Sequence, residues 1–390
     1  MKPYLLRSPR LRSFFALLSA AGTFATACSD VAQTTAPVSI SPARPAMMKV
    51  ATNVSLPARS FRMGFSAIPP RLLDSQSLLS TIDAWMPRAD AAIVQQDVPW
   101  AALLSGATAA SQVKEHVVPL VQYYRAMGLT PVVVTIDPLN SGARDKEAWD
   151  LIARGRSISE PAIQALYKSY VTEVARLARP DYLVLALEVN LVRAVAPAKV
   201  YSALVTMTKA GASAIRTAKL TTRLGVSVEV ETAWDLLPRT TIAANPVFKG
   251  IATERANFTF LQFLGLSAYP HMGGFNSPAQ VPNDYYSRLA GSPALPLMVV
   301  EGGWASNSGR YWKSDAQLQA QWITRQAALL DAAQAIALFQ LNATDIDPST
   351  YPAGPGVDLT PYVGIGIFDT EFRPKPSLEA WDQIFARPKR

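Results

Sequence analysis

Eight short runs of β-forming residues, separated by stretches with helical spacing, most restrict the fold of this chain. We expect strands at 61–67, 91–96, 131–136, 182–189, 223–231, 260–268, 295–301 and 336–341. Helical spacing is clear over 160–177, where apolar residues recur three and four positions apart. Strands that alternate with helices form βα units around a parallel sheet. The sequence therefore predicts an α/β fold.

Eight strands are the number that closes a (β/α)8 TIM barrel. The chain has 390 residues and is 49% hydrophobic, so one domain of this kind can bury its core. A doubly wound open sheet that holds a nucleotide requires a glycine-rich turn after an early strand. No such turn is present, and Gly364-Ile365-Gly366 comes too late and is too short. We predict a single barrel domain over 59–390.

The first residues have the pattern of an export signal. Basic residues precede an apolar run over 14–24, and small residues follow it up to Cys28. The run is too short for a permanent membrane helix. Cys28, the only cysteine, stands in a sequence similar to the bacterial lipobox, although Ala25 replaces the usual leucine. We expect a lipoprotein-like signal peptide over 1–27 and a lipid anchor at Cys28; the alternative is ordinary cleavage and secretion.

Residues 28–58 are rich in Ser, Thr, Ala and Pro and lack a sustained apolar period, which indicates a flexible tether. The protein is then expected to be exported, held in the cell envelope or secreted. The formal net charge is +8, but four basic and no acidic residues lie in 1–27. The mild excess that remains, without a basic cluster interleaved with aromatics, argues against nucleic acid as a partner.

Several chemistries are disfavoured by spacing. His116 and His271 are far apart and show neither of the usual zinc-binding spacings, so we expect no metal and no cofactor. The chain has no G-x-S-x-G elbow, which argues against a serine esterase of the α/β-hydrolase type. We expect a monomer.

Two apolar strands end in a glutamate: Glu188 after the fourth run and Glu301 after the seventh. The carboxyl ends of the strands form the functional face of a barrel, so both side chains are expected at one mouth. Strict alternation would put Ala186, Glu188 and Asn190 inside and Leu187 outside. The structural alternative is that each glutamate pairs with an arginine at its strand end.

A pair of carboxyl groups is what glycoside hydrolysis requires. One, held protonated, donates to the leaving oxygen, while the other attacks or stabilises the anomeric carbon. A separation of about 5 Å would make the enzyme retaining.

Several segments together resemble clan A glycoside hydrolases over most of 60–386. They are Glu301-Gly302-Gly303-Trp304, Tyr269-Pro270, the closing stretch 364–376, and Trp381. Within the clan, stretches 182–191 and 264–270 look closest to the arabinogalactan endo-β-1,4-galactanase family.

The resemblance implies roles for four residues. Glu188 would be the acid/base and Glu301 the nucleophile, Tyr269 would hydrogen-bond the nucleophile, and Trp304 would form part of the sugar platform. The clan has an asparagine before the acid/base that contacts the sugar 2-hydroxyl, and this chain has Leu187 there. Asn190 could substitute for it if the strand end bends.

Further candidates end other strands. Glu229 and Glu231 are expected to line subsites, and an alternative catalytic pair joins one of them to Glu301. Asp97, Trp100 and Asp137 could contact sugar hydroxyls or rings, or else cap loops and pack. His271 could line the cleft or sit in a solvated loop.

The sequence thus predicts a retaining glycosidase that cleaves a β-linked poly- or oligosaccharide by double displacement. Two alternatives stay open. One is a catalytically inactive carbohydrate-binding barrel, motivated by Leu187. The other is a transglycosylase, which would use the same carboxylates.

Overall fold

The computed structural model describes residues 57–390 except 73, 141, 239–245 and 352–358. The predicted signal peptide, the Cys28 anchor and nearly all of the predicted tether lie outside these residues. None of the helices in the described part of the chain combines the length and the apolar character needed to cross a membrane.

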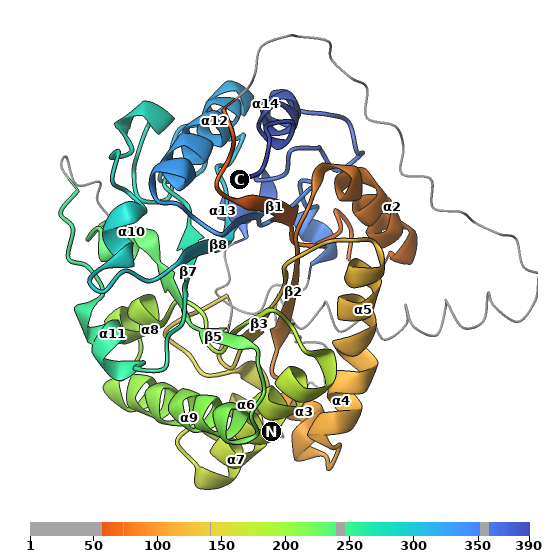
Figure 1. The fold of residues 1–390 in the computed structure, drawn as a ribbon, viewed down its shortest axis with the longest axis vertical. Helices are drawn as coiled ribbons and strands as arrows, with labels where there is room; N and C mark the ends of the chain where they lie inside the picture. Colours follow the sequence, from red (N-terminus) through yellow and green to blue (C-terminus); the bar gives the residue numbers. More distant parts are fainter. Residues whose placement is uncertain (1–56, 73, 141, 239–245, 352–358) are drawn as a thin grey trace, which may run out of the picture.

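The described residues form a closed ring of parallel strands (Figure 1). The strands are β1 (Arg62–Phe65), β2 (Ala92–Asp97), β3 (Val132–Asp137), β4 (Tyr182–Val184), β5 (Arg223–Gly225), β6 (Ser227–Glu229), β7 (Leu264–Ala268), β8 (Leu297–Gly302) and β9 (Ala337–Gln340). They pair in the orders β1-β9-β8-β7-β6 and β2-β3-β4-β5. Only Val226 separates β5 from β6, and the backbone N–H groups of Asp90 and Ala91, just before β2, donate to the carbonyl of Met63 in β1. The predicted (β/α)8 barrel is confirmed.

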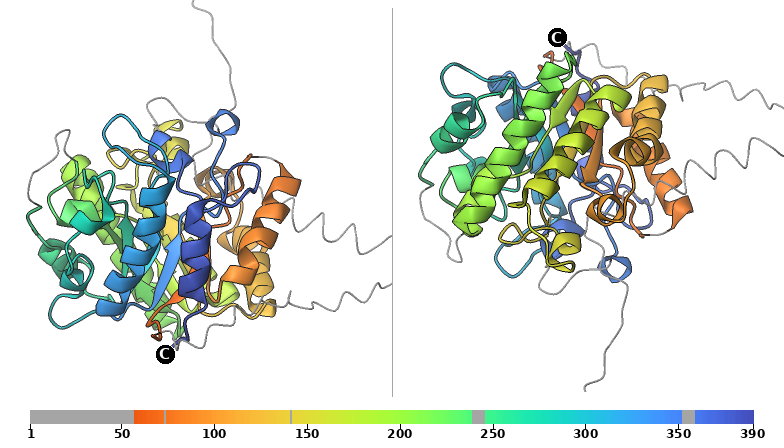
Figure 2. Two further views of the ribbon diagram at one scale, coloured as in Figure 1. Left: turned by 90° about the horizontal axis from the view of Figure 1, so that it is seen from above. Right: turned by 90° about the horizontal axis from the view of Figure 1, so that it is seen from below.

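Helices surround the barrel, as the two side views show (Figure 2). They are α2 (Ser75–Trp85), α3 (Trp100–Leu104), α4 (Ala109–His116), α5 (Val118–Ala126), α6 (Trp149–Ile152), α7 (Pro161–Glu173), α8 (Val189–Val195), α9 (Ala198–Thr217), α10 (Val230–Ala233), α11 (Ala252–Asn257), α12 (Ala316–Ala332), α13 (Thr360–Val363) and α14 (Pro376–Phe385). Short 3-10 helices occupy Met86–Arg88, Pro278–Gln280, Ser287–Ala290 and Pro348–Thr350. The helix predicted over 160–177 is α7 with a π-helical continuation, Val174–Ala178.

The barrel interior has its own apolar cluster, separate from the larger core between strands and helices. Phe263, Met298 and Phe339 belong to this inner cluster and are fully buried. Towards the carboxyl ends of the strands, the side chains become polar: Gln95, Ser267 and Glu301 are buried there. The apolar layer closes the barrel below, so the mouth is where chemistry can occur.

The alternation predicted for the fourth strand is wrong. Strand β4 ends at Val184, Leu187 belongs to the inner cluster, and Ala186 packs in the outer core. A similar irregularity precedes the other glutamate, because the β7–β8 register pairs Leu266 with Val299 but Ser267 with Glu301. An extra residue of this kind re-aims the side chains that follow it. Both glutamates come after such an irregularity.

The fifth predicted strand is also not continuous. It consists of β5 and β6, and helix α10 begins at Val230. Glu229 therefore ends a strand while Glu231 lies in a helix, and the two do not share a strand face.

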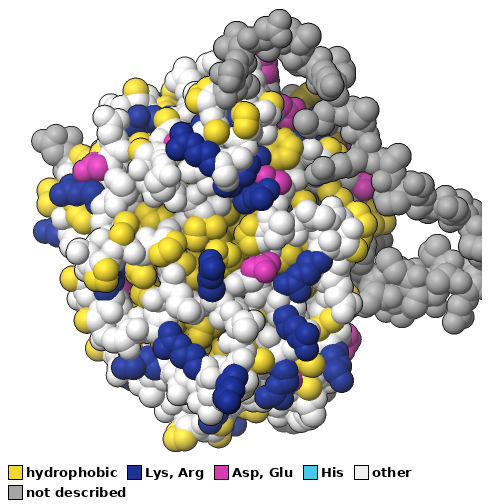
Figure 3. All heavy atoms as spheres, in the orientation of Figure 1, with side chains coloured by type: hydrophobic (Ala, Val, Ile, Leu, Met, Phe, Trp, Pro, Cys, Tyr) yellow, Lys and Arg dark blue, Asp and Glu magenta, His cyan; other side chains and the backbone are white. Residues whose placement is uncertain are grey.

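The face drawn in Figure 3 is the one on which the C-terminus lies. It is the amino-terminal end of the barrel, because Lys389 pairs with Arg59 just before β1. Lys and Arg side chains are scattered across this face among apolar and uncharged ones (Figure 3). They do not gather into a single basic patch there.

Candidate active site

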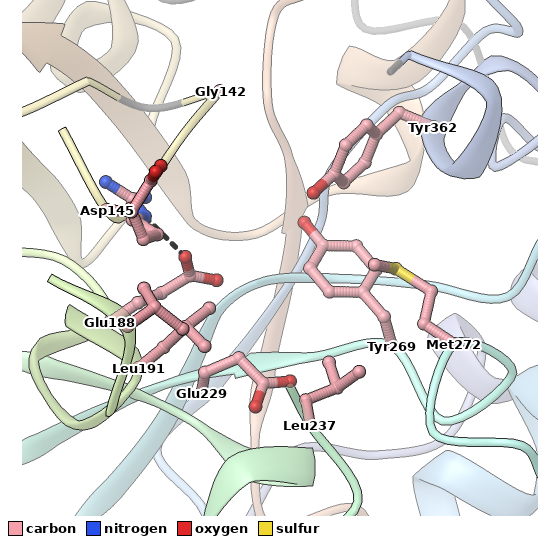
Figure 4. Close-up of a pocket in the computed structure, with 11 residues that line it drawn as sticks. Gly142, Asp145, Glu188, Leu191, Glu229, Leu237, Tyr269, Met272 and Tyr362 are labelled. Atoms are coloured by element: carbon pink, nitrogen blue, oxygen red, sulfur yellow. Dashed lines mark hydrogen bonds and ion pairs between the residues drawn. The ribbon is translucent and has the colours of Figure 1, made fainter. Parts of the chain in front are cut away.

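A cavity of about 480 Å³ lies at the carboxyl ends of the strands. Its walls come from the segments after β3, β4, β6 and β7 and from α13. In Figure 4, Glu188 lies on one side, the hydroxyls of Tyr269 and Tyr362 lie close together on the other, and Glu229 lies below them. Carboxyl and phenol groups therefore converge on one space.

Glu188 is held by a buried arginine. The Nε atom of Arg144 lies 2.6 Å from Glu188 Oε2, and its Nη1 lies 2.5 Å from Asp137 Oδ2. Burial alone would lower the pKa of Arg144, but Asp137, Glu188 and Glu301 together raise it well above its ordinary value. A permanently charged partner stabilises the ionised form of Glu188. The structural alternative weighed for this glutamate, an arginine partner at the strand end, is thus present.

The backbone at Glu188 is unusual. Its φ is +48°, in the left-handed region, which costs a residue other than glycine about 1 kcal/mol. The N–H of Glu188 donates to Ser227 Oγ at 2.8 Å, and its carbonyl accepts from Val192 in α8. These bonds fix the turn from β4 into α8 and aim the carboxyl into the cavity (Figure 4).

Glu301 has neutral partners instead. Gln95 Nε2 donates to its Oε2 and the Tyr269 hydroxyl donates to its Oε1, both at 3.4 Å. Burial, and after it the charge of Glu188, raises the pKa of Glu301 to about 8, although Arg144 opposes the shift. Burial thus favours the protonated form of Glu301, whereas Glu188 has a cation beside it.

Two further carboxyl groups shape the wall. Glu229 lines the cavity and caps α10, accepting from the backbone N–H groups of Glu231 and Thr232. Glu231 is fully buried, and both its oxygens accept from the Tyr269 N–H at 3.1 Å. Burial and the charge of Glu231 raise the pKa of Glu229 well above its ordinary value. Glu231 thus positions Tyr269 and is not one of the cavity-lining residues, which corrects its expected subsite role.

Trp304 is not the exposed platform that the resemblance implied. Its side chain is fully buried, its Nε1 donates to Ser314 Oγ at 2.8 Å, and its ring packs near Trp322. Trp100 is likewise a packing residue, with Nε1 donating to the Pro138 carbonyl at 3.1 Å. Both indoles have their polar atom satisfied inside the protein, so neither lines the cavity.

Asn190 and His271 are also buried. The Asn190 amide exchanges two 2.8 Å hydrogen bonds with the backbone of Glu229, so it joins two segments and does not replace the missing asparagine. His271 packs against Tyr269 and Trp312, and burial lowers its pKa to about 3. It lies neither in the cleft nor in a solvated loop.

The two aspartates predicted after β2 and β3 differ. Asp137 binds Arg144 and accepts from the Leu139 N–H at 3.0 Å, so it reaches the site through the arginine. Asp97 ends β2 opposite Asp137 in the strand register and is not a cavity-lining residue.

Sequence reasoning missed Arg144, Gln95 and Tyr362. Gln95 has a recognisable signal, because it interrupts an apolar strand at an inward position. Arg144 comes from an irregular segment, and Tyr362 comes from the single-turn helix α13, which is too short for periodicity to indicate direction. Among the described residues, no group of three or more His, Cys, Asp or Glu side chains is arranged to hold a metal ion.

In sequence, the chain matches no family model and no curated protein. In structure it is similar to an exo-β-1,4-mannosidase, Op5Man5 from Opitutaceae bacterium strain TAV5, with a TM-score of 0.56 and 14% identity over 84% of this chain and 59% of that one. It is also similar to a GH5_18 protein from Streptomyces cattleya in complex with GlcNAc, with a TM-score of 0.56 and 13% identity over 85% and 83%.

A β-glucuronidase from an uncultured Clostridium sp. gives a TM-score of 0.52 at 12% identity, over 83% of this chain and 50% of that one. The chain thus spans about half of the glucuronidase and about three fifths of the mannosidase. These neighbours are glycoside hydrolases of the broad kind that the sequence resembles, and the likeness does not single out the galactanase family. At such low identity the likeness establishes the (β/α)8 fold alone.

Proposed function

We propose that the protein is a retaining glycoside hydrolase that cleaves a β-linked glycan through Glu188 and Glu301. The observation that carries the proposal is that two buried carboxyls meet at one barrel mouth: Glu188, after β4, lines the cavity, and Glu301, in β8, accepts from the hydroxyl of the cavity-lining Tyr269. The unequal environments of the two carboxyls are what acid and nucleophile roles require.

In the proposed reaction, Glu188 donates a proton to the glycosidic oxygen while a Glu301 oxygen attacks the anomeric carbon. The alcohol leaves, and an ester joins the sugar to Glu301. Glu188 then takes a proton from water, whose oxygen attacks the anomeric carbon and frees Glu301. Tyr269 donates a hydrogen bond to Glu301 and, because burial and Glu301 raise its pKa, remains protonated throughout.

This assignment requires the proton to be on Glu188 when bond breaking begins. Positive charge that develops on the sugar ring stabilises ionised Glu301, and so favours transfer of its proton to Glu188. Arg144 opposes that transfer, because it stabilises ionised Glu188 at 2.6 Å.

The charges around the cavity favour an uncharged sugar. Three acidic residues and one basic residue line it: Asp145, Glu188, Glu229 and Arg144. Arg144 already binds two carboxylates, so a sugar carboxylate would meet net negative charge. We propose a neutral β-glycan, with galactan indicated by the family resemblance and β-mannosides by the name of one neighbour.

The test is release of reducing sugar from β-galactan, β-mannan and β-glucan, with an aryl β-glucuronide as the acidic comparison. Glu188→Gln and Glu301→Gln should each abolish cleavage, while Glu379→Gln, on the exposed surface of α14, should not. Cleavage that survives both the Glu188 and the Glu301 substitution would refute the mechanism.

A second candidate function is a carbohydrate-binding barrel without activity. Leu187 and the Arg144–Glu188 ion pair favour it, because Leu187 cannot hydrogen-bond the sugar 2-hydroxyl and the ion pair engages the carboxyl of the expected acid. Binding of a glycan without release of reducing sugar would establish this function in place of hydrolysis. Transfer of the sugar to a second sugar instead of water would identify the transglycosylase.

A further inference from the structure

A second and larger hollow, of about 1050 Å³, lies between the segments that follow β7 and β8. One wall is formed by residues 272–276 and the other by residues 308–315, with Leu236 after α10 at one end. Met272 lines this hollow and the catalytic cavity as well. Leu236 lines this second hollow, and the next residue, Leu237, lines the catalytic cavity. The two spaces are therefore adjacent parts of the same barrel mouth.

Tyr311 presents an aromatic ring in this second hollow. Its side chain is 52% exposed, and it is the one aromatic among the large exposed apolar side chains of the described residues. The Arg310 guanidinium lies over the ring, 5.3 Å from its centre, so a sugar would pack on the opposite face. An exposed aromatic ring is a surface on which the apolar face of a pyranose can pack.

The segment that carries Tyr311 is fixed from beneath. Trp312 is buried, its Nε1 donates to the Asn307 carbonyl at 2.9 Å, and its ring packs edge to face on His271 at 5.2 Å. The Gly309 N–H donates to the Trp312 carbonyl at 3.1 Å, and the Ser314 N–H donates to Ser308 Oγ at 3.0 Å. These contacts hold the segment in place before any ligand binds, so little ordering is needed on binding.

Polar groups flank the ring. Asn276, Arg310 and Lys313 line the hollow, and all three can donate hydrogen bonds to sugar hydroxyls. Within the described part of the chain, no ion pair involves Arg310 or Lys313. An aromatic surface with a few hydrogen-bond donors beside it is the composition expected of a sugar-binding surface.

We propose that this hollow, with Tyr311 as its aromatic platform, is a remote subsite that binds a pyranose residue of the same glycan chain that enters the catalytic cavity. The inference rests on the proposed function for the identity of the chain. Its structural basis is the continuity of the two spaces at Met272. The protein should then act better on long chains than on single glycosides.

The test compares a long substrate with a short one. For Tyr311→Ala we expect KM to rise about tenfold on the β-glycan that the wild type cleaves, and kcat/KM to change far less on an aryl β-monoglycoside. Tyr311→Phe keeps the aromatic ring, so its KM on the long glycan should stay close to that of the wild type. Ile152→Ala, which removes an exposed apolar side chain in α6, should leave both substrates unaffected.

Binding separates failure of this inference from failure of the proposed function. Calorimetry with the Glu301→Gln variant and β-1,4-linked pentasaccharides of galactose and mannose should show weaker binding when Tyr311→Ala is added. If that loss occurs although the wild type cleaves nothing, the subsite stands and the hydrolase does not. If Tyr311→Ala changes neither binding nor KM, or affects long and short substrates equally, the subsite is refuted.

Discussion

The ends of β4 and β8 carry the same residue type in contrasting surroundings. Glu188 lies beside a charged arginine that Asp137 also holds, whereas Glu301 has a glutamine amide and a phenol as partners. Both side chains are buried, so the contrast comes from their partners rather than from water. The contrast shows that two residues of the same type can be given different electrostatic environments at one barrel mouth.

The largest expected effect follows from removing one member of the pair. Glu301→Gln keeps the shape and the hydrogen-bond capacity but cannot form the ester, so kcat should fall at least about 10³-fold. Steady-state rates on the cleaved glycan measure it. A loss of less than tenfold would mean that Glu301 does not react with the sugar.

The next largest effect is expected from removing the positive charge of Arg144, which lies beside Glu188. Arg144→Gln leaves Asp137 and Glu188 without their cation, which should reduce the free energy of unfolding by about 3 kcal/mol. In the folded fraction the pKa of Glu301 is no longer lowered by Arg144, so the alkaline limb of the pH–rate profile, where the site loses its proton, should move to higher pH.

Denaturant unfolding and a pH series of kcat/KM measure these two results. Arg144→Lys is the matched variant, because it keeps one positive charge and should show smaller changes of the same sign. An alkaline limb that moves to lower pH in Arg144→Gln would contradict the role given to Arg144.

A smaller effect concerns the phenol. Tyr269→Phe removes the 3.4 Å hydrogen bond to Glu301 and leaves the ring in place. Because this bond is long and weak, kcat should fall only about tenfold. Rates on an aryl glycoside would measure it. A fall as large as that of Glu301→Gln would mean that Tyr269 takes part in the chemistry itself.

The smallest effect is on stability. The pKa of Glu301 is raised to about 8 in the folded protein, from an ordinary value of 4.5. The folded state then binds an extra proton between these values, so stability that is present below pH 4.5 is lost as the pH rises through 8. Glu301→Gln has no carboxyl group to ionise. The Tm of this variant minus that of the wild type should therefore increase by about 2 °C or more from pH 5 to pH 8. A difference that does not change with pH would contradict the shift.

The strands were predictable from the sequence because the inside of a barrel needs apolar runs, and each run falls on a strand or, for 223–231, on two. The two glutamates were predictable because a carboxylate interrupts such a run. The irregularities before Glu188 and Glu301 were not, since a shift of one residue depends on the neighbouring strand and not on local pattern. The place of Arg144 in the site was not predictable, because the segment that carries it has no periodicity. Trp304 is buried although it belongs to the predicted motif, because a sequence motif does not determine which way a side chain points.

The central claim is that Glu301 is the nucleophile although its neighbours favour its protonated form. The most direct test is to trap the ester with an activated 2-deoxy-2-fluoro β-glycoside of the sugar that the panel identifies, and to find the labelled peptide by mass spectrometry. The account predicts one label, on Glu301, and none in Glu301→Gln. A label on Glu188, or an active enzyme that takes no label, would contradict it.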